Sequence, residues 1–364
     1  MNNDYSNIKK ALSWLEMAQD HSGDGGVAAW YSLIGGWAPS YIETTGYIIN
    51  TFLEAARFFN DQQYLVRAKR MGDFLLKMQH SSGGFRTHVP SVKKVSPPTV
   101  FNTGQDLLGL SELYTVTKEQ KYLRSFTKAA DFLVNIQNND GSWTKNTYGN
   151  QSHVYHTRVA WGLLTCWQIN HNDRYRQAAV KNLQWALRHQ QPNGWFSNNQ
   201  LPPPNIQLPY THTISYAVEG LLWSGVLLSN EKYIKAAIKG TLPPLHYYLS
   251  HHFIPGTFDK DWRSTDTYSC LTGDAQLALM WLKLYELTKL DVFKIGSTKM
   301  LASLSSIQNC SWHFMLTTGA IPGSWPIWGD VYHNKGYCRL AYLNWATKFY
   351  LDALFLKNQL IKSE

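Results

Sequence analysis

Cysteine is scarce in this sequence. The 364 residues include four cysteines (Cys166, Cys270, Cys310 and Cys338), and no two of them form a Cys-x-x-Cys pair. Their isolation excludes a disulfide framework and the zinc ribbons that need paired cysteines. We therefore expect reduced thiols, as in a cytoplasmic protein, with no bound metal and no cofactor.

Long apolar runs are also missing. No stretch is long and apolar enough to span a membrane, so no membrane span is expected. The first residues, Met1 to Tyr5, are polar, and Lys9, Lys10 and Glu16 follow within the first expected helix. A signal peptide would need an apolar segment here, so the sequence predicts a cytoplasmic protein.

Charged residues are few, at 16% of the chain, while aromatic residues reach 14%. The formal charge of +9 favours an anionic partner. The positive residues are scattered, and Lys93-Lys94 is among the longest basic runs. We therefore expect no nucleic-acid partner. The aromatic share indicates thick helix packing or a cleft that stacks ligands.

An internal repeat dominates the sequence. Each copy is an amphipathic helix that ends in Gln, or in His in the degenerate fifth copy, followed by a polar stretch and a Gly-aromatic or Gly-apolar loop. The helix ends lie 53 to 61 positions apart, at Gln19, Gln79, Gln137, Gln190, His251 and Gln308. The loops are Gly25-Gly26-Val27, Gly83-Gly84-Phe85, Gly141-Ser142-Trp143, Gly194-Trp195, Gly256-Thr257-Phe258 and, after an insertion, Gly323-Ser324-Trp325. Self-similarity at such a period predicts a repeat architecture.

A second, less polar helix follows each loop. These helices are expected at residues 44–59, 103–115, 157–169, 213–228, 271–287 and 342–356. Because they are apolar on most sides they belong inside, and the amphipathic helices belong outside. The helix at residues 5–19 has no inner mate before it, and that at 342–356 has no outer mate after it. The sequence thus predicts one all-α domain over residues 1–364, an (α/α)6 toroid closed by its two terminal helices.

The Gln…Gly-x-aromatic unit resembles the repeat of squalene and oxidosqualene cyclases and of protein prenyltransferases. The inner and outer helices resemble the sugar-active six-hairpin toroids, which include N-acylglucosamine epimerases, unsaturated-uronyl hydrolases and several polysaccharide lyases. Segments such as residues 41–47 and 343–349 resemble proteins of bacterial surface-polysaccharide gene clusters. These resemblances imply a toroid fold, and the second and third imply carbohydrate metabolism.

The cyclase motifs themselves are missing. No Asp-x-Asp-Asp string is present, and Asp259-Lys260-Asp261-Trp262 is the nearest match. No Asp-Asp-x-x-Asp string for diphosphate and magnesium is present either. The Cys and His spacing that would suggest a prenyltransferase zinc set is also missing. Terpenoid cyclisation is therefore the least favoured of the activities that the resemblance implies.

Polar residues recur where the inner helices begin. In a ring of hairpins these helix starts meet at one mouth of the central cavity. Thr45, Thr103 and Thr272 are expected to cap their helices. Capping does not account for the other polar residues at this level, which are Tyr47, Gln105, Arg158, Tyr216 and Asp274.

Aromatic, basic and amide residues in the loops add a second layer. Such side chains suit sugars, which stack on their C–H faces and form hydrogen bonds at their edges. The expected substrate-binding residues are Trp30, Tyr31, Trp37, Tyr41, Glu43, Tyr47, Arg86, His88, Asn102, Gln105, His153, Trp262, Arg263 and Trp328.

The favoured catalytic set is His156, Arg158, His212 and Tyr216. Proton abstraction beside a uronate carboxylate needs a base, an acid and groups that neutralise the carboxylate. His or Tyr can serve as the base or the acid, and Arg can hold the carboxylate by two parallel hydrogen bonds. This set predicts a uronate C5-epimerase or a polysaccharide lyase acting on an acidic saccharide.

Three other readings stay open. A glycoside hydrolase would need two carboxylates, and Glu219 with Asp274 is the preferred pair. A non-catalytic toroid that binds sugar is the second reading, and a terpenoid cyclase-like protein is the third. The sequence does not identify the sugar or the oligomeric state.

Overall fold

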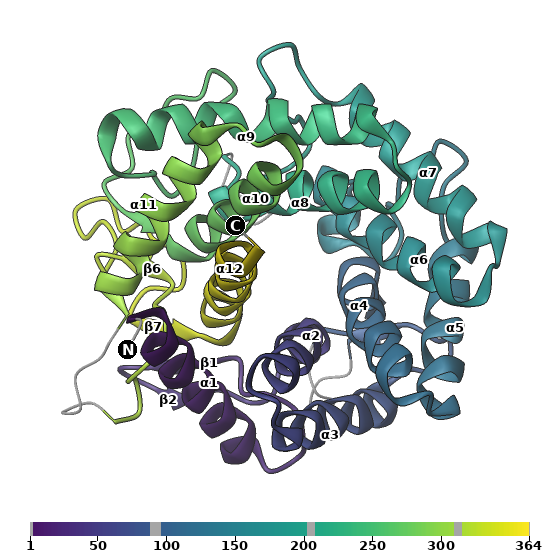
Figure 1. Cartoon of the computed structure of the whole chain (residues 1–364). Coiled ribbons are helices and arrows are strands. Elements are labelled where there is room, and N and C mark those ends of the chain that lie inside the picture. The colour runs from purple at the N-terminus through teal and green to yellow at the C-terminus, as the bar shows by residue number, and fades with distance from the viewer. Residues whose placement is uncertain (1–2, 88–95, 202–207, 309–314, 364) are drawn as a thin grey trace.

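The computed structural model describes residues 3–87, 96–201, 208–308 and 315–363. Its main elements are α-helices in two concentric layers (Figure 1). The inner helices are α2 (Ile42–Phe59), α4 (Val100–Thr117), α6 (Thr157–Asn170), α8 (Thr211–Leu227), α10 (Leu271–Thr288) and α12 (Asn344–Ser363). The outer helices are α1 (Asn3–Ser22), α3 (Gln62–Met78), α5 (Gln120–Asn135), α7 (Asp173–Arg188), α9 (Glu231–His251) and α11 (Asp291–Ile307). The predicted all-α (α/α)6 toroid is confirmed.

Burial separates the two layers as the sequence pattern predicted. Helix α8 buries 14 of its 17 residues, whereas α7 buries 7 of its 16. An inner helix is surrounded by neighbours, so it needs apolar or small residues on most sides. An outer helix keeps one face in water and needs a single apolar stripe.

The ring closes through its terminal helices. Each inner helix packs against the next one along the chain, and α12 packs against both α2 and α1. Lys357 Nζ on α12 lies 2.7 Å from a carboxylate oxygen of Asp4 on α1. Figure 1 shows the first and last helices side by side. The predicted pairing of the two terminal helices is confirmed.

Short strands collect where the inner helices begin. One antiparallel sheet has the order β2-β1-β7 (Gly36–Trp37, Trp30–Ser32 and Ala341–Leu343), with Tyr31 opposite Tyr342. The other two sheets pair β3 with β4 (Phe85–Arg86 and Pro98–Thr99) and β5 with β6 (Ser269–Cys270 and Ser324–Trp325). Strands β4, β5 and β7 each end immediately before an inner helix, so this end of the ring carries the connecting loops.

The repeated glutamines join neighbouring hairpins. Gln137 Nε2 donates to the carbonyl oxygen of Gly141 in its own loop at 3.1 Å and to that of Ala178 on the next outer helix at 2.9 Å. Gln79 makes the same pair of bonds at 2.7 and 2.9 Å. Gln19, Gln190 and Gln308 repeat the pattern. The predicted anchoring of adjoining loops by these side-chain amides is confirmed.

The glycine assigned to the sixth loop was wrong. Gln308 Nε2 donates to the carbonyl oxygen of Gly319 at 2.8 Å, and Gly319 has φ +90°. The corresponding glycine of the second loop, Gly83, has φ +97°. A side chain is strained in this left-handed region, so glycine is favoured at both places. Gly323-Ser324-Trp325 matches the motif in sequence, but it lies after Gly319, the glycine that Gln308 binds.

The predicted threonine caps were also wrong. The residues that precede α2, α4 and α10 make no side-chain capping bond. Thr45 lies in the first turn of α2, where its Oγ1 accepts from the Val27 backbone N–H at 3.0 Å. Thr103 accepts from the Phe85 N–H at 2.9 Å in the same way. These two hydroxyls therefore tie the first and second glycine loops to the inner helices that follow them.

No helix within the described ranges is both long enough and apolar enough to cross a lipid bilayer.

Candidate active site

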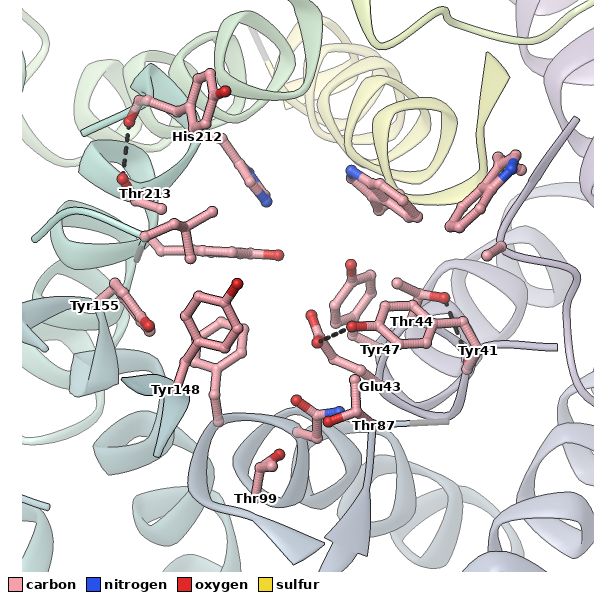
Figure 2. Close-up of a pocket in the computed structure, with 18 of the residues that line it drawn as sticks. Tyr41, Glu43, Thr44, Tyr47, Thr87, Thr99, Tyr148, Tyr155, His212 and Thr213 are labelled. Atoms are coloured by element: carbon pink, nitrogen blue, oxygen red, sulfur yellow. Dashed lines mark hydrogen bonds between the residues drawn. The ribbon is translucent and has the colours of Figure 1, made fainter. Parts of the chain in front are cut away.

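A cavity of about 800 Å³ opens at the loop end of the ring (Figure 2). Its walls come from the first turns of α2, α4, α8 and α12 and from the connecting loops. The lining residues are Ala29, Trp30, Ala38, Pro39, Ser40, Tyr41, Glu43, Thr44, Tyr47, Thr87, Ser96, Thr99, Phe101, Asn102, Thr147, Tyr148, Gly149, Tyr155, Leu201, Tyr210, His212, Thr213, Tyr216, Tyr337 and Trp345. The volume falls within the usual range of small-molecule sites.

Tyrosine gives the cavity its chemical character. Seven tyrosines lie among the lining residues. Burial raises the pKa values of Tyr41, Tyr47 and Tyr155 well above the ordinary value for a phenol, so their hydroxyls stay protonated at neutral pH. Aromatic faces beside neutral hydroxyl donors suit a sugar, which has apolar C–H faces and a polar edge.

His212 enters the cavity from the first turn of α8. Its ring lies 4.2 Å from that of Tyr216, between ring centroids, and Figure 2 shows the imidazole pointing into the cavity. Nδ1 lies 2.7 Å from Oε1 of the buried Gln276. Burial lowers the pKa of His212 to about 3, and the charge of Arg158 adds to this effect. The side chain is therefore a neutral imidazole at physiological pH.

Glu43 enters from the first turn of α2. Only 8% of the residue is exposed, and Tyr41 Oη donates to its Oε2 at 3.2 Å. Burial raises the pKa of Glu43 to about 7, against the opposing effects of the Tyr41 hydrogen bond and the Arg158 charge. A substantial fraction of this carboxyl group is therefore protonated at neutral pH.

The ring places these two groups on facing walls. Helices α2 and α8 are three positions apart in the closed sequence of six inner helices, so they stand opposite one another. Figure 2 shows Glu43 and His212 on different sides of the cavity. Two titratable groups whose pKa values are displaced in opposite senses are the expected arrangement for an acid and a base. The neutral imidazole can accept a proton, and the protonated carboxyl can donate one.

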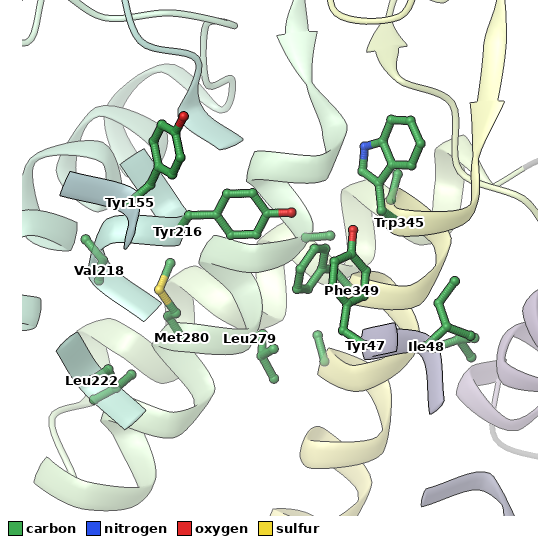
Figure 3. Packing of buried hydrophobic residues seen from close by; sticks show 14 of the residues in the cluster. Tyr47, Ile48, Tyr155, Tyr216, Val218, Leu222, Leu279, Met280, Trp345 and Phe349 are labelled. Atoms are coloured by element: carbon green, nitrogen blue, oxygen red, sulfur yellow. The ribbon is translucent and has the colours of Figure 1, made fainter. Parts of the chain in front are cut away.

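Arg158 lies behind the cavity wall. It is 1% exposed and forms an ion pair with Glu219, which is also buried. Its Nε donates to Gln105 Oε1 at 2.7 Å. The guanidinium carbon is 4.7 Å from the ring centroid of Tyr216, which lines the cavity, whereas Arg158 does not. Figure 3 shows Tyr216, Tyr47 and Phe349 pointing toward one another at this level.

The predicted site residues fall into two groups. Those that line the cavity are Trp30, Tyr41, Glu43, Tyr47, Asn102, His212 and Tyr216. Those outside its lining are Tyr31, Trp37, Arg86, Gln105, His153, His156, Arg158, Glu219, Trp262, Arg263, Asp274 and Trp328. His88 lies outside the described residues.

The packing, exposure or hydrogen bonds of several residues in the second group show what surrounds them outside the cavity lining. Trp37 packs against Trp14 at 5.5 Å between ring centroids, and Trp328 is 51% exposed. His153 Nε2 lies 2.8 Å from the carbonyl oxygen of Tyr148. His156 is fully buried among aromatic rings, which holds its pKa well below the usual value. Burial raises the pKa of Asp274 well above the usual value for a carboxyl group.

Sequence reasoning missed several residues of the site. Tyr148 and Tyr337 lie in long connections, where no periodicity marks the orientation of a side chain. Trp345 follows the start of α12, so the helix-start rule could have found it. Gln276, which contacts His212, is two residues after the predicted site residue Asp274 on α10. No group of three or more His, Cys, Asp or Glu side chains in the described part of the chain could hold a metal ion.

Comparisons with known proteins agree on the fold. The family model described as pectic acid lyase matches residues 102–162. A crystal structure of an unsaturated glucuronyl hydrolase specific for heparin superposes with a TM-score of 0.77 at 16% identity, covering 99% of this chain and 98% of that one. A cellobiose 2-epimerase from Bacillus thermoamylovorans gives 0.76 at 13% identity, covering 98% of both chains. The glucuronyl hydrolase of Bacillus sp. GL1 gives 0.73 at 14% identity, covering 96% of both. No curated protein sequence matches the chain.

Proposed function

We propose that this protein is a carbohydrate-active enzyme of surface-polysaccharide metabolism that moves a proton at a carbon of an acidic sugar. His212 is the base and Glu43 is the acid. The observation that carries this proposal is the pairing of a neutral imidazole and a protonatable carboxyl on facing walls of one tyrosine-lined cavity. The favoured reaction is proton abstraction at C5 of a uronate residue, leading to epimerisation or β-elimination.

The proton balance is simple in both reactions. His212 Nε2 takes the C5 proton, and the electron pair enters the carboxylate as an enolate. In epimerisation Glu43 returns a proton to C5 from the opposite face. In elimination Glu43 protonates the departing O4 as the C4–O4 bond breaks. Each group exchanges one proton with the substrate, as general acid–base catalysis requires.

The sugar carboxylate needs hydrogen-bond donors in either reaction. Direct binding by Arg158 was predicted, but Arg158 is paired with Glu219 and lies outside the cavity lining. Asn102 and the tyrosine hydroxyls do line the cavity, and they can donate to the carboxylate oxygens. The relatives of similar fold named for glucuronyl substrates support an acidic sugar.

The cavity favours proton abstraction over hydrolysis by a carboxylate pair. Glu43 is the one carboxyl group among the described lining residues. The preferred hydrolytic pair, Glu219 and Asp274, lies outside that lining. An isoprenoid would leave the hydroxyl, amide and carboxyl groups of the walls without hydrogen-bond partners, at a cost in binding free energy. The isolated cysteines support a cytoplasmic location, which stays a prediction.

Hydrogen exchange tests the proposal directly. The protein is incubated in D2O with oligosaccharides that contain glucuronate or galacturonate, and C5 deuterium and ultraviolet absorption by an unsaturated product are measured. We expect one of these two signals, and we expect His212→Gln and Glu43→Gln to lower it at least about 100-fold. His246→Gln, which replaces an exposed histidine on α9, is the matched control and should keep full activity.

The pH profile provides a second readout. Because Glu43 must be protonated, activity should fall as pH rises above about 7, the pKa of this carboxyl. Cleavage of the saccharide with neither C5 deuterium nor an unsaturated product would replace this proposal with hydrolysis. Binding without any turnover would leave a sugar-binding toroid.

A further inference from the structure

A continuous line of buried polar contacts runs from His212 into the wall of the ring. His212 Nδ1 contacts Gln276 Oε1 at 2.7 Å, and Gln276 Nε2 donates to Glu219 Oε2 at 3.1 Å. The same Glu219 oxygen pairs with Arg158. Arg158 Nε donates to Gln105 Oε1 at 2.7 Å. The five side chains come from α4, α6, α8 and α10, and each is at most 5% exposed.

Whether each side chain in this line can donate or accept determines the donor and the acceptor in the next hydrogen bond. The buried Arg158 guanidinium keeps its positive charge and can only donate, and Glu219 is its buried ion-pair partner, so Glu219 accepts from it as a carboxylate. A carboxylate can only accept, so the NH2 group of Gln276 must face Glu219. The carbonyl oxygen of Gln276 must then face His212, and it can only accept. His212 Nδ1 therefore carries a proton, and in a neutral imidazole Nε2 must be the unprotonated nitrogen.

We infer that Gln276 is a positioning residue, held by the Arg158–Glu219 pair, that keeps His212 as the Nδ1–H tautomer with the Nε2 lone pair toward the cavity. The assignment of Nε2 as the base rests on the proposed function. The Nδ1 proton is assigned from the contacts, and the unprotonated Nε2 follows from the burial that keeps the imidazole neutral, so the tautomer does not depend on the proposed function. The buried ion pair thus has a role besides stability, because it fixes the orientation of an amide that could otherwise rotate.

The tautomer can be measured without substrate. Protein labelled with 15N at histidine is examined by two-bond 1H–15N correlation spectra, and His212 is identified by the signals lost in His212→Gln. We expect wild-type His212 Nδ1 in the protonated range and Nε2 in the unprotonated range. A wild-type spectrum with Nε2 protonated would overturn the inference by itself, whatever the variants do.

Two variants test the roles of Gln276 and the ion pair. Gln276→Leu removes the acceptor, so His212 should shift toward the Nε2–H tautomer that predominates for free imidazole side chains. Gln105→Leu is the matched control, because it removes a buried glutamine that bonds to Arg158 Nε and to the Phe101 carbonyl oxygen, whereas the bond to His212 comes from Gln276. The control should leave the tautomer unchanged. An unchanged Nδ1–H tautomer in Gln276→Leu would refute the role of Gln276.

Folding and activity are measured on the same samples. If Gln276→Leu does not fold, the double variant Arg158→Met with Glu219→Gln removes the ion pair without leaving a buried charge. The amide of Gln276 can then rotate, and mixed His212 tautomers are expected. An unchanged Nδ1–H tautomer would refute the role of the ion pair.

In folded Gln276→Leu, kcat for C5 exchange should fall at least about tenfold with KM nearly unchanged. If the wild type shows no exchange, the proposed function fails, while the tautomer result still decides this inference.

Discussion

Glu43 should make the protein less stable as the pH rises. Burial raises its pKa from 4.5 to about 7 in the folded state, so between these values the folded protein binds more protons than the unfolded chain. Stability therefore falls as pH increases through this range. A difference of about 2.5 pKa units corresponds to about 3 kcal/mol, since each unit is worth about 1.4 kcal/mol.

Substitution of Glu43 by Gln isolates this effect. Glutamine has the shape of the protonated carboxyl and can still accept from Tyr41, but it does not ionise. We expect the stability of Glu43→Gln relative to wild type to increase by about 3 kcal/mol between pH 4.5 and pH 8. For 364 residues this equals about 4 °C in Tm, from an unfolding entropy of about 2 cal/mol/K per residue.

Calorimetry at the two pH values measures the difference. The control is Glu231→Gln on α9, where the exposed carboxylate pairs with Lys235 and has a lowered pKa. Its Tm relative to wild type should change little, and in the opposite direction. If the Tm difference between Glu43→Gln and wild type is the same at pH 4.5 and pH 8, Glu43 ionises normally in the folded protein. The assignment of Glu43 as the acid would then lose its basis.

Two further predictions concern residues outside the cavity. Gln137→Ala should lower the free energy of unfolding by about 2 kcal/mol without changing substrate affinity, because the carbonyls of Gly141 and Ala178 lose their donor. Denaturant unfolding measures this loss. The control Gln177→Ala, which replaces an exposed glutamine on α7, should have no comparable effect. Loss of activity in fully folded Gln137→Ala would contradict the anchor role. Arg158→Met should cost about 3–5 kcal/mol by leaving Glu219 buried and unpaired, and adding Glu219→Leu should restore most of it. Equal destabilisation in the single and double variants would show that the pair does not act as a unit.

The helix register could be predicted well because it depends on local patterns. Inner helices expected to begin at residues 157 and 271 begin at Thr157 and Leu271. The start expected at residue 44 lies at Ile42. A helix that is apolar on most sides has one stable place in a ring, so its layer follows from composition. The glutamine anchors could be predicted for the same reason, since each bonds to its own loop.

The cavity was harder to predict, and its residues show why. Tyr47, His212 and Tyr216 lie near inner-helix starts, and the helix-start rule correctly placed them at the mouth. The same rule failed for Arg158 and Asp274. Position along a helix gives the depth of a side chain but not its rotation toward or away from the axis of the ring.

Sequence alone therefore determined the number of hairpins, the inner and outer layers and the end of the ring that carries the polar residues. These features depend on periodicity and burial, which repeat in every unit. Only the tertiary structure decided which polar groups meet. Glu43 and His212 are 169 residues apart, and they face each other because a closed ring of six hairpins sets the first inner helix opposite the fourth. Arg158 is withdrawn from the cavity because Glu219, one helix further round, satisfies its charge in a buried place that no local pattern reveals.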